Sequence, residues 1–434
     1  MNPRSILPAL LLAVALPSAL AQKIEITPAT VLLDQTPSIR VTGLAPGASV
    51  TLEADLADGA AHIWTSSADF TADPQGVVDL AQQAPSAGSY RTLSATGLIW
   101  SMRPLSADTH LYQAPHDLDP QLIRFRLFQD GKQTAAAQLL QSALAPGVRL
   151  YPVEGRLHGI LFVPPGSAPH PGILVLGGAE GGIPARRAAW LADHGYAAFA
   201  LAYFDAPGLP GTLQRIPLEY FAEALAWMTQ RPEIERSRIA VAGFSRGGEA
   251  ALQLAFMFPV IKAVVVWNAA NVRYPSCCAP NFGPVWTWRK QPLVWVMPAM
   301  NPDPITLVHA TIPVEDIHAP ILFIAGGDDS VWPSPMMLDD MEGRLRAAHF
   351  AFPVVTLRYP HAGDRAGFPE VVPAYINGVP DPLTGRKTTL GGTLEGNAAS
   401  TLDAIPKILA FLQQNLAGTA SPVSQSVRPA QSAH

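Results

Sequence analysis

The chain has 434 residues and a formal net charge of −5 at pH 7, from 29 lysine and arginine residues against 34 aspartate and glutamate residues. This length is enough for one large catalytic domain and a smaller partner domain, each with its own hydrophobic core. The sequence contains no basic run or stripe, so nucleic acid is not expected as a partner.

The first residues follow the order of a secretory signal peptide. Arg4 supplies a positive charge, residues 6–16 are apolar, and the small-residue triplet Ala-Leu-Ala ends at Ala21. The apolar run is shorter than the roughly 20 residues that a membrane-spanning helix needs, which favours a cleaved signal over an anchor. We therefore expect removal of residues 1–21 and a periplasmic or secreted protein without stable membrane insertion.

Residues 22–150 contain short alternating apolar runs that are broken by turn residues. Residues 38–41 precede Gly43, and residues 122–127 precede an Asp-Gly pair. Alternation with a period of two, with turn residues at intervals of about ten, is typical of an antiparallel β-sandwich. No catalytic group of residues is evident in this predicted domain.

From residue 151 the pattern changes to apolar strands that alternate with amphipathic helices. Alternating strand and helix units predict a mainly parallel sheet with helices on both faces, which is an α/β fold, over residues 151–417. The strands are expected at residues 172–176, 197–203, 239–242, 263–267, 321–325 and 354–359.

The end of the chain is expected to form one more helix and a tail. The helix is predicted from about Ala398 to Leu416, with a kink or a break at Pro406. Residues 418–434 are rich in Ala, Ser, Pro and Gln without periodicity, which predicts a disordered tail.

Ser245 is the candidate nucleophile. It lies in the segment GFSRGGE, residues 243–249, directly after an apolar run and before a segment with helical spacing. This is the pattern of a strand-turn-helix elbow, in which Gly243 and Gly247 allow two backbones to approach because they lack Cβ atoms. A GxSxG match alone is weak evidence, but the strand before it and the helix after it favour a nucleophile over a structural turn.

A serine nucleophile needs a base to take its proton and an acid to orient that base. In this fold class the acid and then the histidine follow the serine in the chain, each after a later strand. Asp328 and Asp329 follow the strand expected at residues 321–325, and we favour Asp329 as the acid and Asp328 as a turn cap. His361 follows the strand expected at residues 354–359 and is the candidate base, with a solvated loop histidine as the alternative.

Backbone N–H groups are expected to stabilise the oxyanion of the reaction. One belongs to Arg246, directly after the nucleophile, and the second to Gly178 or Ala179 in the glycine-rich loop of residues 177–182. This loop matches neither GxxxxGK[ST] nor GxGxxG, so the oxyanion role is preferred to phosphate binding.

No cofactor and no metal ion is expected. The only two cysteines, Cys277 and Cys278, are neighbours in the sequence and lack the further ligands and the spacing of a metal site. They cannot close a long chain loop either, so core packing must stabilise the exported protein.

The motifs of the chain resemble the acyl-CoA thioesterase and bile acid-CoA:amino acid N-acyltransferase (BAAT) family of α/β-hydrolases. The resemblance implies a β-sandwich before the catalytic domain, and cleavage of a thioester through an acyl-enzyme with Ser245 as nucleophile and Asp329 as acid. The bile-acid transferases of the family carry cysteine at the nucleophile, so serine favours transfer to water. The matching motifs are LGGAEGG (176–182), GLPGT (208–212), GFSRGGE (243–249), IPVEDIHAPILFIAGGDDSVWPS (312–334) and GGTLEGNAAS (391–400).

Two features depart from the family pattern. The family histidine falls at the position of Asp364, with His361 three residues earlier, and a signal peptide would remove the protein from coenzyme A. We expect an exported serine acyl hydrolase that cleaves a small-molecule acyl thioester or ester through Ser245. The alternatives are an impaired acyl-binding protein in which Asp364 replaces the base, and a dienelactone-hydrolase-like or peptidase-like serine hydrolase.

Overall fold

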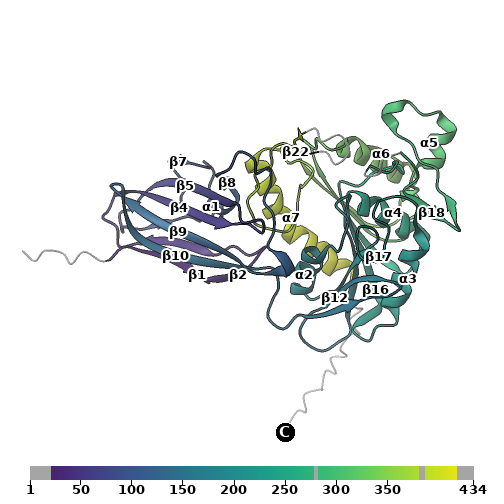
Figure 1. Ribbon diagram of the computed structural model, residues 1–434, viewed down its shortest axis with the longest axis horizontal. Helices are drawn as coiled ribbons and strands as arrows, with labels where there is room; N and C mark the ends of the chain where they lie inside the picture. Colours follow the sequence, from purple (N-terminus) through teal and green to yellow (C-terminus); the bar gives the residue numbers. More distant parts are fainter. Residues whose placement is uncertain (1–20, 278–281, 381–386, 418–434) are drawn as a thin grey trace, which may run out of the picture.

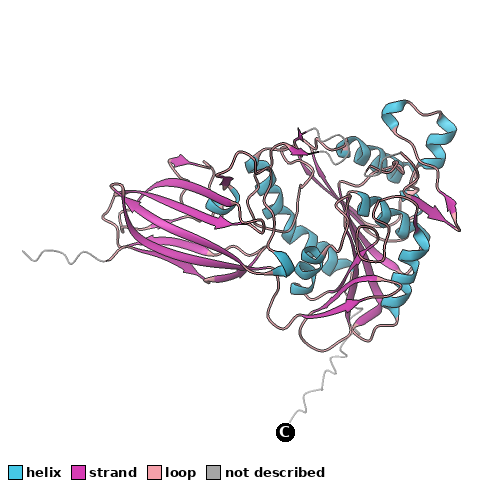
Figure 2. Ribbon diagram, viewed as in Figure 1, coloured by secondary structure: helices cyan, strands magenta, loops and turns pink. Residues whose placement is uncertain are grey.

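The computed structural model describes residues 21–277, 282–380 and 387–417. The predicted signal segment apart from Ala21, the predicted tail and Cys278 lie outside these residues. Figure 1 shows an elongated molecule with the N-terminal strands at one end, and Figure 2 shows the helices gathered around the sheet at the other end.

The N-terminal domain is a sandwich of two sheets, as predicted. Its larger sheet has the order β2-β10-β9-β4-β5-β7, and its smaller sheet has the order β1-β3-β6. All pairs are antiparallel except β10 with β2. Along β5 every second residue is buried, including Trp64 and Phe70, so the alternation in the sequence marks the face that packs in the core. The elements are β1 (Lys23–Thr27), β2 (Thr30–Leu32), β3 (Ser38–Thr42), β4 (Ser49–Ala57), β5 (Ile63–Thr71), β6 (Val78–Asp79), β7 (Ala87–Gly88), α1 (Gly97–Trp100), β8 (Arg103–Pro104), β9 (Gln121–Gln129) and β10 (Lys132–Ser142).

The C-terminal domain contains an eight-stranded sheet of order β11-β12-β14-β13-β16-β17-β20-β21. The pairs from β14 to β21 are parallel, and β11 and β12 add an antiparallel edge. This arrangement confirms the predicted α/β-hydrolase fold. The strands are β11 (Arg149–Val153), β12 (His158–Val163), β13 (His170–Leu176), β14 (Ala197–Ala202), β16 (Ile234–Phe244), β17 (Ile261–Trp267), β20 (Ile321–Gly326) and β21 (Val354–Tyr359).

Helices cover both faces of this sheet. Buried residues of α2 and α7 form one core with the strands, and buried residues of α3, α4 and α6 form a second core on the other face. The helices are α2 (Ala185–Asp193), α3 (Leu218–Thr229), α4 (Arg246–Met257), α5 (Pro304–Ala310), α6 (Ser334–Ala347) and α7 (Leu394–Asn415), and the short strands β15 (Ile216–Pro217), β18 (Trp286–Trp288) and β19 (Gln291–Pro292) pair beside α3.

Helix α7 differs from its prediction at two points. It begins four residues earlier, because the Thr393 side chain caps it by accepting a hydrogen bond of 2.9 Å from the Gly396 N–H. It also continues across Pro406 and is not divided there. Ala404 and Ile408, on either side of the proline, are both buried against the same face of the sheet, so packing outweighs the local cost of proline.

The two domains are joined by buried polar contacts as well as by apolar packing. The Asp34 carboxylate accepts a hydrogen bond of 2.9 Å from the Trp190 indole N–H of α2, and His194 Nε2 lies 2.6 Å from the same oxygen. Val371 of the C-terminal domain belongs to the core of the sandwich, and its N–H donates to the Leu33 carbonyl at 2.7 Å. None of the helices described combines the length and the apolarity of a membrane span.

The Asp34 contact should contribute to stability. Asp34→Ala is expected to lower the free energy of unfolding by about 1 to 3 kcal/mol, because it leaves the buried Trp190 N–H without an acceptor. Urea denaturation followed by tryptophan fluorescence measures the change. The control is Asp339→Ala, which removes an exposed pair with Arg358 and should change stability by less than about 1 kcal/mol. Equal losses in the two variants would contradict this role for Asp34.

Candidate active site

Ser245 occupies a strained turn between β16 and α4. Its φ of 51° and ψ of −113° lie in a region that residues with a side chain rarely adopt. Two backbone hydrogen bonds hold this conformation. The Ser245 N–H donates to the Trp267 carbonyl and the Glu249 N–H donates to the Ser245 carbonyl, each at 2.9 Å.

The glycines of the elbow are required by close backbone contacts. A Cβ atom on Gly247 would lie 2.3 Å from the Gly177 carbonyl oxygen, and one on Gly243 would lie 2.2 Å from the Gly247 carbonyl oxygen. Any larger residue would push the start of α4 away from the end of β13. The sequence pattern therefore reports a real steric requirement of this turn.

The first turn of α4 is anchored by a buried ion pair. Arg246 Nη1 lies 2.7 Å from Glu249 Oε2, and Glu249 Oε1 accepts a hydrogen bond of 2.6 Å from the Trp286 indole N–H. The Arg246 guanidinium also donates to the Pro275 carbonyl. The Arg246 side chain is thus held by these contacts, and its backbone N–H, in the first turn of the helix, has no partner within the helix.

The second predicted oxyanion donor lies in the loop after β13. Glu180 is half-exposed, with a side-chain exposure of 49%, and its carboxylate lies 2.7 Å from Arg187 Nη2. Partial burial would raise the pKa of Glu180, but Arg187 and the Gly178 N–H lower it below its ordinary value. Gly178 and Ala179 both remain candidates for the second oxyanion donor, and the Glu180 carboxylate lies on the Gly178 side of the loop.

Asp329 follows β20, as expected for the acid. Its Oδ1 accepts from the N–H groups of Val331 and Trp332 at 2.9 and 3.3 Å, so Asp329, and not the exposed Asp328, caps this turn. Its Oδ2 is buried and has no hydrogen-bond partner among the described residues. Burial raises the pKa of Asp329, although hydrogen bonds from Ser334 and the turn oppose this shift.

The two positions considered for the base, His361 and Asp364, differ in burial. The His361 side chain is exposed, and within the described residues it makes no hydrogen bond to Ser245 or Asp329. Asp364 is 7% exposed, and its N–H donates to the Leu390 carbonyl at 2.8 Å. Asp364 Oδ1 is buried and has no partner in the described part of the chain.

Asp364 is buried and Asp329 is partly buried, and the charge of Asp329 acts on the Asp364 carboxyl group. Burial raises the pKa of Asp364 to about 7, and the negative charge of Asp329 adds to this shift. Arg365 opposes it and Glu180 reinforces it. Burial and a neighbouring carboxylate both disfavour the ionised form of Asp364, so the two effects act in the same direction.

Asn268 links the elbow to Asp364, and sequence patterns gave no signal for it. Its Nδ2 donates to the Asp364 carbonyl, and its Oδ1 accepts from the Gly326 N–H at 3.1 Å. It follows Trp267, whose carbonyl holds the Ser245 N–H. Asn268 is 1% exposed, so it fixes the ends of β17 and β20 and the Asp364 backbone in one buried network.

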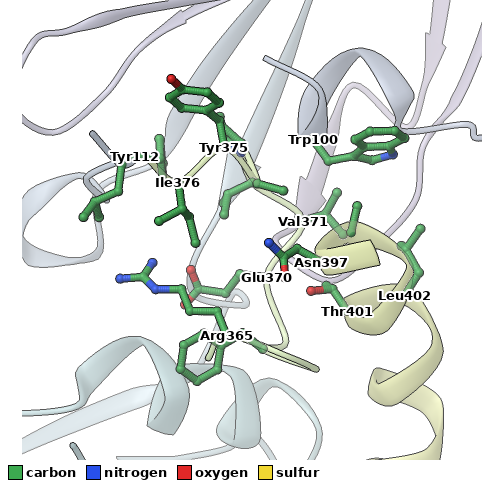
Figure 3. Close-up of a pocket in the computed structure, with 16 residues that line it drawn as sticks. Trp100, Tyr112, Arg365, Glu370, Val371, Tyr375, Ile376, Asn397, Thr401 and Leu402 are labelled. Carbon is green, nitrogen blue, oxygen red and sulfur yellow. The ribbon is translucent and has the colours of Figure 1, made fainter. Parts of the chain in front are cut away.

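A cavity of about 720 Å³ lies beside the oxyanion loop and between the two domains. Its lining runs from Glu180 and Gly181 to Arg365 and to Tyr112 of the sandwich. A smaller cavity of about 70 Å³ shares Tyr112 and Arg365 with it and extends towards Tyr375, as Figure 3 shows. The larger volume is in the range of small-molecule sites. No cluster of metal-binding side chains occurs among the described residues.

Comparison with known proteins identifies relatives along most of the chain. The Acyl-CoA thioester hydrolase/BAAT N-terminal region matches residues 34–155, and the BAAT / Acyl-CoA thioester hydrolase C terminal matches residues 216–418. Acyl-coenzyme A thioesterase 1 of Rattus norvegicus is 33% identical over 408 residues, covering 91% of this chain and 96% of that protein. Peroxisomal succinyl-coenzyme A thioesterase of Mus musculus is 31% identical over 409 residues, covering 90% and 96%.

Two solved structures resemble parts of the chain more distantly. A puromycin-hydrolyzing peptidase of Mycobacterium tuberculosis has a TM-score of 0.43 and 13% identity, covering 86% of this chain and 54% of that chain. A dienelactone hydrolase-like promiscuous phosphotriesterase from metagenomic libraries has a TM-score of 0.40 and 18% identity, covering 62% and 99%.

Asp364→Asn should change stability in a way that depends on pH. The native pKa of about 7 lies above the ordinary value of 3.8, so wild-type stability falls as pH rises between these values. Asparagine cannot ionise, so the stability of the variant relative to wild type should grow over this interval, by up to roughly 4 kcal/mol, and level off above it. Urea denaturation across this pH range measures the difference, and a difference independent of pH would contradict the shifted pKa.

Proposed function

The chain belongs to the acyl-CoA thioester hydrolase/BAAT family, and we propose that it is a serine hydrolase that cleaves an acyl thioester or ester through an acyl-Ser245 intermediate. The observation that carries this proposal is the backbone of Ser245, with φ 51° and ψ −113° between β16 and α4. This geometry is typical of a nucleophile elbow, which presents the serine hydroxyl to the substrate. A serine used only as a turn residue would not require it.

The proposed reaction has two steps. Ser245 Oγ attacks the acyl carbon while its proton passes to a base, and the oxyanion accepts hydrogen bonds from the Arg246 N–H and from an N–H of the loop after β13. Collapse of this intermediate releases a thiol or an alcohol, which takes the proton from the base. Water then attacks the acyl-serine with the same base, which releases the acid and restores Ser245.

We propose Asp364, in place of His361, as this base. Asp364 is buried with a free carboxylate oxygen and is coupled to Asp329, whereas the His361 side chain is exposed. A pKa near 7 makes both forms of Asp364 available at neutral pH, as a general base requires. Asp329 would then favour the protonated, neutral form of Asp364 because protonation removes the repulsion between two carboxylates.

The substrate class follows from the family and from the cavity. Relatives are named for acyl-CoA thioesters, and the cavity of about 720 Å³ beside the oxyanion loop is large enough for an acyl chain. On the sequence pattern of residues 1–21 we also propose export to the periplasm or beyond. There the leaving group would be another thiol or an alcohol, since coenzyme A is not expected outside the cytoplasm.

Three variants test the nucleophile and the base. Hydrolysis of p-nitrophenyl butyrate should fall by about 10³-fold or more in Ser245→Ala and in Asp364→Asn, because each removes a group that acts on the reacting atoms. In His361→Ala it should change by less than about threefold. Ser245→Ala should also lose labelling by a fluorophosphonate probe, with the wild type as the positive control.

The other outcomes are equally decisive. Equal labelling of wild type and Ser245→Ala would contradict the proposed nucleophile. Loss of activity in His361→Ala with retention in Asp364→Asn would make His361 the base. A wild-type protein that binds acyl compounds without turnover would favour the impaired acyl-binding alternative. A preference for peptides or a dienelactone as substrates would favour a peptidase-like or dienelactone-hydrolase-like enzyme.

The pH dependence of kcat/KM should report Asp364. Because the ionised carboxylate is the base, kcat/KM is expected to rise with pH through about 7. The negative charge of Glu180 raises the pKa of Asp364, so Glu180→Gln should move this rise to lower pH. Rate measurements from pH 5 to 9 test both statements, and a rise that Glu180→Gln leaves in place or moves to higher pH would contradict them.

A further inference from the structure

We propose that Arg365 forms an anion-binding subsite in the cavity between the two domains, and that the substrate carries a second anionic group at a distance from its reacting carbonyl. The claim that the bound molecule is the substrate rests on the proposed function, whereas the subsite itself does not. The chemical class of the ligand is a carboxylate or a phosphate.

The charges that line the larger cavity are unbalanced. Three arginines and two glutamates contribute to its wall. The Arg186 guanidinium donates to both oxygens of the Glu370 carboxylate, at 3.0 and 3.1 Å. Arg187 Nη2 lies 2.7 Å from the Glu180 carboxylate. These pairs use both glutamates and leave Arg365, whose guanidinium has no ion pair and no hydrogen bond with any residue that the structure describes.

Arg365 lies where it can meet a ligand. Its side chain lines both cavities, and Figure 3 shows it extending into the smaller one beside Glu370 and opposite Tyr375. Its guanidinium carbon lies 5.9 Å from the centroid of the Phe368 ring, which supports one side of the group. The other donors of this planar group remain available for a bidentate contact with a carboxylate or phosphate.

The Arg365 guanidinium, which is partly exposed in the cavity wall, has no ion-pair partner among the described residues. Burial lowers the pKa of Arg365, although Asp364, Glu180 and Glu370 oppose this effect from beyond ion-pair distance. Glu180 and Glu370 are already bound to other arginines. An anionic ligand would supply the missing partner and restore the charge balance of the cavity.

The wall of the cavity has the mixed polarity that a charged acyl chain requires. Glu180 and Gly181, from the loop after β13, line it together with Arg365, which directly follows Asp364, the base proposed above. Apolar side chains, among them Ile183, Phe368 and Val372, also line this cavity. We therefore favour an acyl group with an apolar spacer and a terminal carboxylate over a phosphate in the leaving group.

The test compares two esters of equal chain length, mono-p-nitrophenyl glutarate and p-nitrophenyl pentanoate. At pH 9, where Asp364 is ionised in every variant, the wild type should prefer the glutarate in kcat/KM by roughly 10- to 100-fold, as expected for charge-assisted hydrogen bonds. Arg365→Gln should lower this ratio by about tenfold or more. The ratio for Arg365→Lys should lie between those of the wild type and Arg365→Gln, because lysine keeps the charge but cannot donate two parallel hydrogen bonds to a carboxylate.

Arg156→Gln is the matched control. It removes the same charge from a side chain that is 84% exposed and does not line the cavity, so it should leave the ratio unchanged.

A second comparison tests whether Arg365 binds a phosphate of the leaving group. It measures kcat/KM for butyryl-coenzyme A, which carries phosphates, and for butyryl-N-acetylcysteamine, which does not. If Arg365→Gln loses the preference for the glutarate ester, the ligand of the subsite is a carboxylate. If it loses only the preference for butyryl-coenzyme A, the subsite stands with a phosphate as its ligand. If Arg365→Gln alters neither ratio, the subsite is excluded.

A binding measurement separates this inference from the proposed function. In the Ser245→Ala protein, glutarate should raise the unfolding temperature more than the uncharged glutaramide does, and addition of Arg365→Gln should abolish the difference. If the wild type hydrolyses no ester and glutarate still binds through Arg365, the proposed function fails and the subsite stands. If the esters are hydrolysed through Ser245 but glutarate binding does not depend on Arg365, the subsite fails alone.

Discussion

The close approach of two backbones beneath Ser245 is the constraint on which the C-terminal domain depends. Gly247 lies so near the Gly177 carbonyl that a Cβ atom would come within 2.3 Å of it. This contact requires β13 and β16 to be adjacent and α4 to begin directly after β16. It also brings the loop with Ala179 and Glu180 beside the nucleophile, and the main cavity begins at that loop.

A second constraint comes from burying several charges near one another. Arg246 with Glu249 and Arg187 with Glu180 are neutralised within their own pairs. Asp364 is not, because its Oδ1 has no partner in the described structure and Asp329 adds a like charge. Burial and this like charge raise the pKa of Asp364 to about 7, and the proposal of Asp364 as the base rests on this shift together with its burial and its free oxygen.

The sequence predicted what is encoded locally. The apolar run at residues 172–176 and the elbow glycines predicted β13 and the turn at Ser245, because strand burial and steric fit depend on adjacent residues. The exposure of His361 and the burial of Asp364 depend instead on contacts with distant segments, such as the hydrogen bond from Asp364 to Leu390. Asn268 was missed for the same reason, since its role exists only once β17, β20 and the Asp364 loop meet.

The most direct test of the account is peptide mapping of the acyl-enzyme by mass spectrometry. The wild-type protein would be mixed with p-nitrophenyl butyrate, quenched in acid during the first turnover and digested. If Ser245 is the nucleophile, the peptide that contains Ser245 should carry the mass of one butyryl group, and no other peptide should. An unmodified Ser245 peptide during turnover, or a butyryl group on another residue, would contradict this role of Ser245.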